Sequence, residues 1–166
     1  MKHTLTAQEL DEDQWTRYRD IRLAALESDE QAFGGNLDSE RLFSEDEWRS
    51  KARQYVAIVV NHDDSDIAMM TVENLNGDFG ATCWVGSCWV SPKYRKMGAL
   101  RALFDCLDSM AIERNWITQG LGVWVDNEIA IAAYERLGFE KKGEKQESSR
   151  KPGMYYQRMI RKTSSN

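Results

Sequence analysis

Two segments of the sequence combine residue types that could bind and transfer a chemical group. In residues 89–103, an apolar stretch runs into a short loop that contains Arg95 and Gly98, and a helical pattern follows. Backbone N–H groups at the start of a helix have no intrahelical acceptor, so they can bind a phosphate oxyanion. Gly98 would let the phosphate approach the backbone closely. The alternative is an ordinary strand-to-helix turn whose basic side chains are solvated.

The second segment, residues 125–139, could supply a proton donor. Asn127 stands where a strand is expected to end, so its side chain could cap the next helix or bind an amide group of a ligand. Tyr134 follows two helical turns later on the same helix face. A phenol with a pKa of about 10 can act as a general acid. The alternative is that Asn127 only caps the helix and Tyr134 only packs.

The spacing of apolar residues predicts the elements that would position these two segments. The expected strands are 2–6, 55–60, 67–75, 82–90, 121–125, 139–144 and 154–160, and the expected helices are 13–26, 44–52, 100–111 and 129–137. Gly138 stands where a helix C-terminal glycine is expected. This order predicts a mixed α/β fold, and the crossover over residues 82–125 should be right-handed.

Length and composition bound the class of protein. The 166 residues suffice for one compact domain, which we expect over residues 1–162, with a disordered tail at 163–166. A formal net charge of −5 argues against nucleic acid as the main partner. No apolar run approaches the roughly 18 residues of a membrane span, and no secretory signal is recognised, so we expect a soluble cytoplasmic protein without a membrane partner. Two histidines and three cysteines with no Cys-x-x-Cys pair predict no metal site.

Together the two segments resemble the GNAT superfamily of acyl-CoA-dependent N-acetyltransferases. The family's cofactor motif, V-x-P-x-x-R-x-x-G-x-G/A, is matched from Val90 through Gly98. The second motif, N-x-x-A-x-x-x-Y-x-x-x-G-F, is matched by Asn127, Ala130, Tyr134, Gly138 and Phe139. The resemblance covers residues 55–160 well, with one helix and one strand between the motifs as in the family. It implies a single domain whose central, mostly antiparallel sheet contains one splayed parallel strand pair and is flanked by helices.

The resemblance also implies acetyl-CoA as co-substrate and assigns residues to it. The main chain of Trp89 and Val90 would pair with the pantetheine arm, and Asn127 would contact the pantetheine or a water. The pyrophosphate would be bound beside Arg95 by the N–H groups of Lys96, Met97, Gly98, Ala99, Leu100 and Arg101. Leu100 departs from the family pattern, which has a small residue there. Because the contact uses the main chain, we expect the cofactor site to persist with altered packing.

In the implied reaction a neutral amine attacks the thioester directly. Tyr134 would be the general acid near the sulfur, and the N–H of Val90 would stabilise the developing oxyanion. Many family members place a glutamate on the fourth strand as base, but residues 82–89 contain no carboxylate. Glu73 and Asp78 are the substitutes that we predict, acting directly or through a water; surface charge is the alternative for both.

The acceptor is expected to be a small or amino-acid-like amine. Phe33, Phe43 and Trp48 could form an aromatic rim of its pocket, or could simply pack. Residues 1–66 carry 8 basic and 16 acidic side chains, which suggests that the acceptor enters from an acidic N-terminal half. Alternatives are an acetyltransferase for protein α-amino groups or lysines, a non-catalytic acyl-CoA sensor, and a plain interaction module. Dimers are common in the resembled family, so a homodimer is also considered.

Cysteine and tryptophan residues on the expected strands are interpreted as packing residues. Cys88 is expected to behave as a small buried apolar residue and not as a nucleophile. Trp84, Trp89 and Trp124 are expected to belong to the core, because tryptophans at alternate strand positions more often pack than bind ligands.

Overall fold

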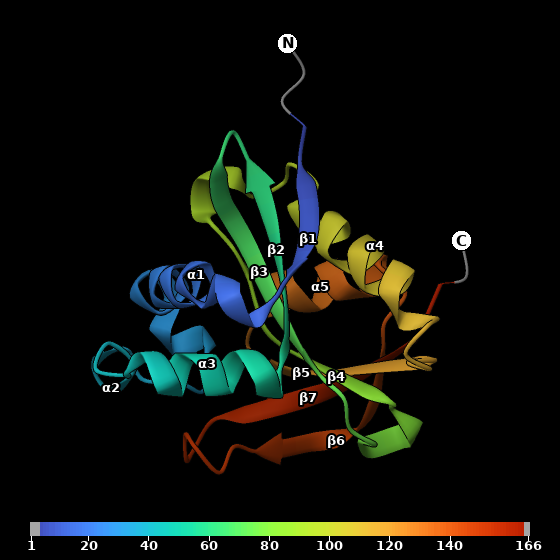
Figure 1. Cartoon of the computed structure of the whole chain (residues 1–166). Coiled ribbons are helices and arrows are strands. Elements are labelled where there is room, and N and C mark those ends of the chain that lie inside the picture. The colour runs from blue at the N-terminus through green and yellow to red at the C-terminus, as the bar shows by residue number, and fades with distance from the viewer. Residues whose placement is uncertain (1–3, 165–166) are drawn as a thin grey trace.

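The computed structural model describes residues 4–164 and contains a single twisted sheet (Figure 1). Within these residues the strand order is β1-β2-β3-β4-β5-β7-β6, with β4 and β5 parallel and every other neighbouring pair antiparallel. The strands are β1 (Thr6–Leu10), β2 (Val56–His62), β3 (Ser65–Glu73), β4 (Cys83–Val90), β5 (Thr118–Trp124), β6 (Glu140–Glu147) and β7 (Tyr155–Lys162). The predicted mixed fold with one parallel pair is therefore confirmed.

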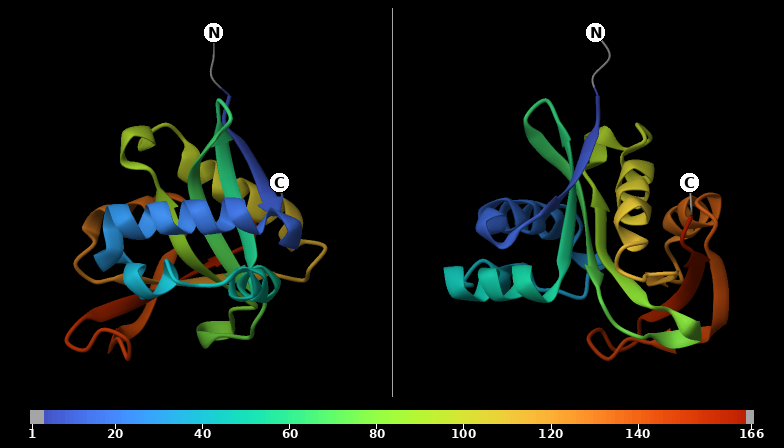
Figure 2. Two further views of the ribbon diagram at one scale, coloured as in Figure 1. Left: turned by 60° about the vertical axis from the view of Figure 1, so that its left-hand side comes forward. Right: turned by 45° about the vertical axis from the view of Figure 1, so that its right-hand side comes forward.

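Helices cover both faces of the sheet (Figure 2). The helices are α1 (Trp15–Asp29), α2 (Leu37–Glu40), α3 (Glu45–Gln54), α4 (Ala99–Ala111) and α5 (Glu128–Arg136). The first three lie on one side and α4 and α5 on the other. None of the helices in residues 4–164 is long and apolar enough to cross a membrane.

The continuous apolar run in β2 follows from this two-sided cover. Successive strand residues point to opposite faces, and here both faces are buried. Ile58 and Val60 belong to the core under α4 and α5, whereas Ala57 and Val59 belong to the core under α1 and α3. A sheet with one solvated face would instead have required an alternating pattern.

Most predicted elements agree with the structure within a few residues, but the first strand does not. The sequence predicts it at residues 2–6 and the structure has it at Thr6–Leu10, where Leu10 is buried opposite Ala57 of β2. Lys2 and His3 lie outside the described residues. Helix α1 also continues to Asp29, beyond the predicted end at residue 26, because tertiary contacts of Asp29 described below add to the local helical preference.

The parallel pair separates soon after it forms, and this separation positions the site. Strands β4 and β5 pair only from Cys83–Gln119 to Val85–Leu121. Along the rest of β4 the other edge pairs with β3, interrupted by a bulge in which Ser87 has a φ of 50°. The second half of β4 therefore has one edge that no strand of residues 4–164 covers.

At the C-terminal end, ordered contacts reach slightly past the predicted domain boundary. Strand β7 ends at Lys162, and the N–H of Thr163 donates to the carbonyl of Ile117 at 3.0 Å. The Gln119 side chain donates to the Thr163 hydroxyl at 3.0 Å. Thr163 is thus held by hydrogen bonds, although the sequence places it in the tail; Ser165 and Asn166 lie outside the described residues.

Candidate active site

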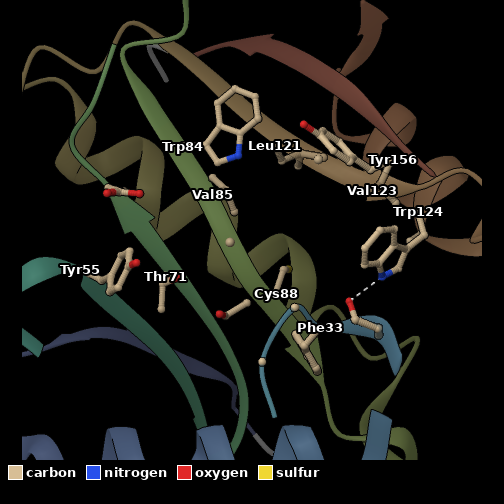
Figure 3. A pocket seen from close by; sticks show the side chains of 18 of the residues that line it. Phe33, Tyr55, Thr71, Trp84, Val85, Cys88, Leu121, Val123, Trp124 and Tyr156 are labelled. Atoms are coloured by element: carbon tan, nitrogen blue, oxygen red, sulfur yellow. Dashed lines mark hydrogen bonds between the residues drawn. The ribbon is translucent and has the colours of Figure 1, made fainter. Parts of the chain in front are cut away.

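A cavity of about 510 Å³ opens where β4 and β5 separate (Figure 3). Figure 3 shows Thr71, Val85 and Cys88 on one side of it and Leu121, Val123 and Tyr156 on the other. The α1–α2 connection closes the remaining side, where the Trp124 indole N–H donates to the Ala32 carbonyl at 3.0 Å. The further lining residues are Tyr18, Arg22, Phe33, Gly34, Gly35, Lys51, Tyr55, Glu73, Trp84, Gly86, Ser87, Gly122, Asn127, Ala130, Tyr134 and Arg150.

One part of this cavity contains a phenol and a thiol in contact. Tyr134 lies on α5 and is 9% exposed, with its ring packed edge-on against Phe104 and Phe139. Its hydroxyl lies beside the thiol of Cys88 on β4, which contributes, after burial, to the raised pKa of Tyr134. Burial raises the pKa of Tyr134 well above its usual value, and burial also raises the pKa of Cys88 to about 11. Both groups therefore hold their protons at neutral pH, so Tyr134 has a proton to donate and Cys88 is a poor nucleophile.

The start of α4 has the properties of an anion site. At the start of α4, the N–H of Ala102 donates to the carbonyl of Gly98 at 3.0 Å. This is the first backbone hydrogen bond of the helix. The N–H groups from Lys96 to Arg101 have no acceptor within residues 4–164. Gly98 has a φ of 90°, and a Cβ built on it would meet nothing within 4 Å. Free N–H groups beside open space at a helix start fit the pyrophosphate of coenzyme A.

The main chain of Val90 points toward the open edge of β4. The next residue, Ser91, donates its N–H to Ile67 O at 2.8 Å across the β3 edge. Hydrogen-bonding groups alternate in direction along an antiparallel strand, so those of Val90 point away from β3. The Val90 carbonyl accepts from Arg95 Nε at 3.0 Å, which leaves the Val90 N–H directed into the gap between β4 and β5. Trp89 is 8% exposed and belongs to the core under α1 and α3.

Arg95 connects the α4 loop to helix α1. Its guanidinium donates to Asp29 Oδ2 at 2.8 Å, and the indole N–H of Trp89 donates to the same carboxylate at 3.3 Å. In the described conformation Arg95 thus binds a carboxylate and a carbonyl of the protein, while its loop supplies the free N–H groups.

For Asn127 and Leu100 the sequence left open a structural role or a role in ligand binding. The Asn127 side chain accepts the N–H of Ala130 at 3.1 Å, so it caps α5, and it also lines the cavity. Leu100 is half-buried against the core under α4. Its side chain therefore belongs to the apolar face of α4, and the main chain at this position is free for a ligand.

The two predicted bases occupy different places. Glu73, at the end of β3, is half-buried and lines the cavity, and no cation of residues 4–164 pairs with it. Asp78 does not line the cavity; it accepts from Arg158 Nη1 at 2.8 Å beside the β6–β7 hairpin. Only Glu73 is brought to the same space as Tyr134.

The three residues predicted to form an aromatic rim also occupy different places. Phe33 lines the cavity, but Trp48 is 1% exposed and packs edge-on against Tyr18 and Phe43 in the core under α1 and α3. Phe43 does not line the cavity either. Trp84 and Trp124, which the sequence suggested as core residues, are half-buried and line the cavity instead.

A buried ion pair at the cavity wall was not predicted from the sequence. Arg22 of α1 donates to both carboxylate oxygens of Glu40 on α2, at 2.9 and 3.1 Å, and to the Ser87 hydroxyl at 3.0 Å. The side chains of Arg22 and Glu40 are 12% and 7% exposed. Gly35 lies so close to the pair that a Cβ there would collide with Glu40. The pair thus joins both helices to the β4 bulge. The doublet Gly34-Gly35 is the feature of the sequence that could have indicated this close approach.

A buried proton donor and an unpaired carboxylate around one cavity, together with a free anion-binding helix start that follows β4, define a group-transfer site. The chain matches the Acetyltransferase (GNAT) family over residues 9–139, so it belongs to that family, and the resemblance of its two motifs is confirmed. It is accordingly an acetyltransferase of the class that takes acetyl-CoA as co-substrate.

Solved structures with low sequence identity share the fold. Ribosomal-protein-S5-alanine acetyltransferase from Vibrio fischeri is 13% identical with a TM-score of 0.77, over 99% of this chain and 96% of that one. The yncA protein from Salmonella typhimurium, whose structure holds its cofactor acetyl-CoA, is 17% identical with a TM-score of 0.73, over 98% and 95%. Spermidine N-acetyltransferase from Vibrio cholerae, in complex with CoA and spermine, is 16% identical with a TM-score of 0.71, over 96% and 95%.

Proposed function

We propose that the protein transfers the acetyl group of acetyl-CoA to the primary amine of a small or amino-acid-like acceptor by direct attack. One observation carries this proposal: Tyr134 and Glu73 line the same cavity, one with a firmly held proton and the other without a cationic partner. An acid and a base that share one space can serve the two proton transfers of amine acylation.

Each group has a distinct role in the proposed reaction. Glu73, through a water, takes the proton that an alkylammonium must lose before it can attack. The N–H of Val90 binds the thioester oxygen as negative charge develops on it. Tyr134 gives its proton to the departing sulfur, and burial keeps this proton available over the physiological pH range. The N–H groups from Lys96 to Arg101 and the side chain of Asn127 hold the coenzyme.

The enclosure of the cavity supports a small acceptor over a protein substrate. The Lys151 ammonium donates to the carbonyls of Glu30 and Gln31 at 3.1 and 3.4 Å, and Trp124 donates to Ala32. These bonds hold the β6–β7 loop and the end of β5 against the α1–α2 connection. An extended peptide would have to displace them, whereas a small amine would not.

The direct test is to follow the release of free CoA thiol from acetyl-CoA with a panel of amines, next to calorimetric binding of CoA alone. The proposal expects CoA binding and turnover of at least one small amine. Binding without turnover of any amine or peptide would favour an acyl-CoA sensor. Turnover only of protein N-termini or lysines would favour a protein acetyltransferase. Absence of CoA binding would contradict all three.

A further inference from the structure

The charges around the acceptor part of the cavity do not match the acidic N-terminal half of the sequence. Three cationic side chains line the cavity, Arg22, Lys51 and Arg150, against one carboxylate, Glu73. Eight of the 16 acidic residues of the first 66 positions pair with arginines of residues 4–164, as in Asp66–Arg17, Glu45–Arg49, Glu12–Arg53 and Asp29–Arg95. None of the acidic residues that the structure describes in these first 66 positions lines the cavity, so their excess does not reach the site.

The cations of the cavity differ in whether the protein already compensates them. Arg22 is paired in a bidentate manner with Glu40. Lys51 and Arg150 have no acidic side chain of residues 4–164 within 4.0 Å of their nitrogens. The Lys51 ammonium lies 5.3 Å from the ring centre of Phe43, and the Arg150 side chain runs along Gly34, where a Cβ built on the glycine would lie 3.3 Å from Nη1. Two uncompensated cations and one uncompensated carboxylate therefore share the space.

The chain brings Lys51, Arg150 and Glu73 to the cavity from three separate elements, and no ion pair joins them within residues 4–164. Lys51 lies in the last turn of α3, and the N–H of Tyr55 donates to its carbonyl at 3.0 Å. Tyr55 lines the cavity beside β2, whose first residue, Val56, stands opposite Val72, next to Glu73. Arg150 comes from the β6–β7 loop, which the Lys151 bonds hold against the α1–α2 connection.

We infer that the acceptor is an amine that also carries a carboxylate, and that Lys51 and Arg150 bind this carboxylate in the acceptor part of the cavity. A ligand with one ammonium and one carboxylate complements this arrangement: its carboxylate meets the two free cations, and Glu73 faces its ammonium. A planar guanidinium suits a carboxylate because it can donate two parallel N–H bonds. A polyamine, by contrast, would place its second cation beside Lys51 and Arg150. This inference rests on the proposed function and narrows its substrate class.

The test compares L-amino acids with the corresponding amino acid amides as acceptors of acetyl-CoA. An amide lowers the pKa of the neighbouring amine and so raises the neutral fraction, which means that chemical reactivity alone favours the amides. We expect the amino acids to have the higher kcat/KM by about tenfold, the size of one charge-assisted hydrogen bond, and this preference should shrink as salt is added. Equal or better use of the amides, of spermidine or of O-phosphoethanolamine would overturn the inference.

Matched variants locate the preference. Lys51→Met combined with Arg150→Gln should reduce the carboxylate-to-amide ratio to near one and leave CoA affinity unchanged. Arg53→Met, on the same helix, and Lys145→Gln, on β6, remove cations that do not line the cavity, so the ratio should persist in them. A ratio that survives in the double variant would overturn the assignment to these two residues.

A binding measurement separates failure of this inference from failure of the proposed function. N-acetyl-L-leucine and N-acetyl-L-leucinamide are titrated into the CoA complex, which requires no turnover. The inference expects tighter binding of the carboxylate ligand even if no acceptor is turned over, in which case the proposed catalysis alone fails. No carboxylate preference in binding, together with measurable acetyl transfer to other amines, would overturn the inference and leave the proposed function standing.

Discussion

The proposed donor part and acceptor part of the site are built by different means. In the proposed function the donor part comprises the start of α4, which lies outside the cavity lining, the open edge of β4 and Tyr134 on α5, and its key contacts would be main-chain N–H groups directed by secondary structure. The acceptor part uses side chains of α1, α3, β3 and the β6–β7 loop, which are far apart in the sequence.

This difference explains which part can be recognised from a short motif. A helix start and a strand edge present N–H groups in fixed directions whatever the side chains are, so the donor part needs only glycine and a few anchors. The acceptor part depends on which side chains meet across the cavity. A family can therefore keep one donor site while its acceptor sites diverge, and each part should fail in its own way when altered.

The largest effect is expected from the ion pair that joins the acceptor wall to β4. Arg22→Met leaves Glu40 buried without a cation, so the free energy of unfolding should fall by about 3–5 kcal/mol, as for other broken buried pairs. The measurement is chemical denaturation followed by tryptophan fluorescence. Arg19→Met, which removes a surface pair with Asp20, is the control and should change stability by at most about 0.5 kcal/mol.

Adding Glu40→Leu to Arg22→Met sharpens this prediction. The double variant buries no lone charge, so much of the lost stability should return. A double variant as unstable as Arg22→Met alone would mean that the geometry of the Ser87 bulge, and not the unpaired carboxylate, limits stability.

Removal of the proton donor should damage catalysis without damaging coenzyme binding. Tyr134→Phe keeps the ring packed against Phe104 and Phe139 and removes the hydroxyl, so kcat should fall by about 10²-fold, a usual size for a lost general acid. Calorimetric affinity for CoA should stay within about twofold because the N–H groups that hold it are intact.

Tyr156→Phe is the matched control for this variant. Its hydroxyl is bound to Gln146 at 2.9 Å on the opposite wall of the cavity, so its loss should affect the KM for the acceptor more than kcat. A Tyr134→Phe enzyme with weakened CoA binding and normal kcat would contradict the acid role.

A smaller effect is expected from the glycine of the coenzyme loop. Gly98→Val forces a β-branched residue into φ near 90°, which costs about 1–2 kcal/mol. The loop can relieve this strain by turning its N–H groups away from the coenzyme. The Kd for CoA should therefore rise by about tenfold. Gly80→Val is a close control, because Gly80 has a φ of 81° and equally open surroundings but lies between β3 and β4, away from the start of α4. Similar stability loss in both variants with weaker CoA binding only in Gly98→Val is the expected result; equal CoA affinity would refute the loop's role.

The smallest effect concerns alkaline pH. The pKa of Tyr134 is raised by burial, so the folded protein holds this proton more tightly than the unfolded chain, whose tyrosines titrate near about 10. The stability that the raised pKa of Tyr134 contributes is complete below about pH 10, the pKa of an unfolded tyrosine, and is lost as pH rises above it. The unfolding temperature should therefore decrease above about pH 10, and less steeply in Tyr134→Phe than in the wild type. Tyr18, whose pKa burial raises to about 12, keeps part of the decrease in both proteins.

The sequence was most informative where function depends on local backbone geometry. The helix of residues 99–111, the glycine that starts it and the tyrosine on α5 were all recognisable from spacing, because each lies within one continuous segment. Strand limits were less certain at β1, where pairing with β2 and not local preference decides the register. For Phe43 and Trp48 the sequence left open an aromatic rim or simple packing; Trp48 is buried in the core under α1 and α3, and Phe43 packs against that core.

By itself the sequence determined the family and the order of the elements, and it predicted a main-chain donor site, because periodicity, capping and turn chemistry act over a few neighbouring residues. Only the tertiary structure decided that Glu73 and not Asp78 shares the cavity with Tyr134, that Glu40 neutralises Arg22, and that Lys51 and Arg150 stay uncompensated. These facts depend on which charges from distant segments come within a few ångströms of each other, and that is set by how the sheet splits and how the helices pack on it.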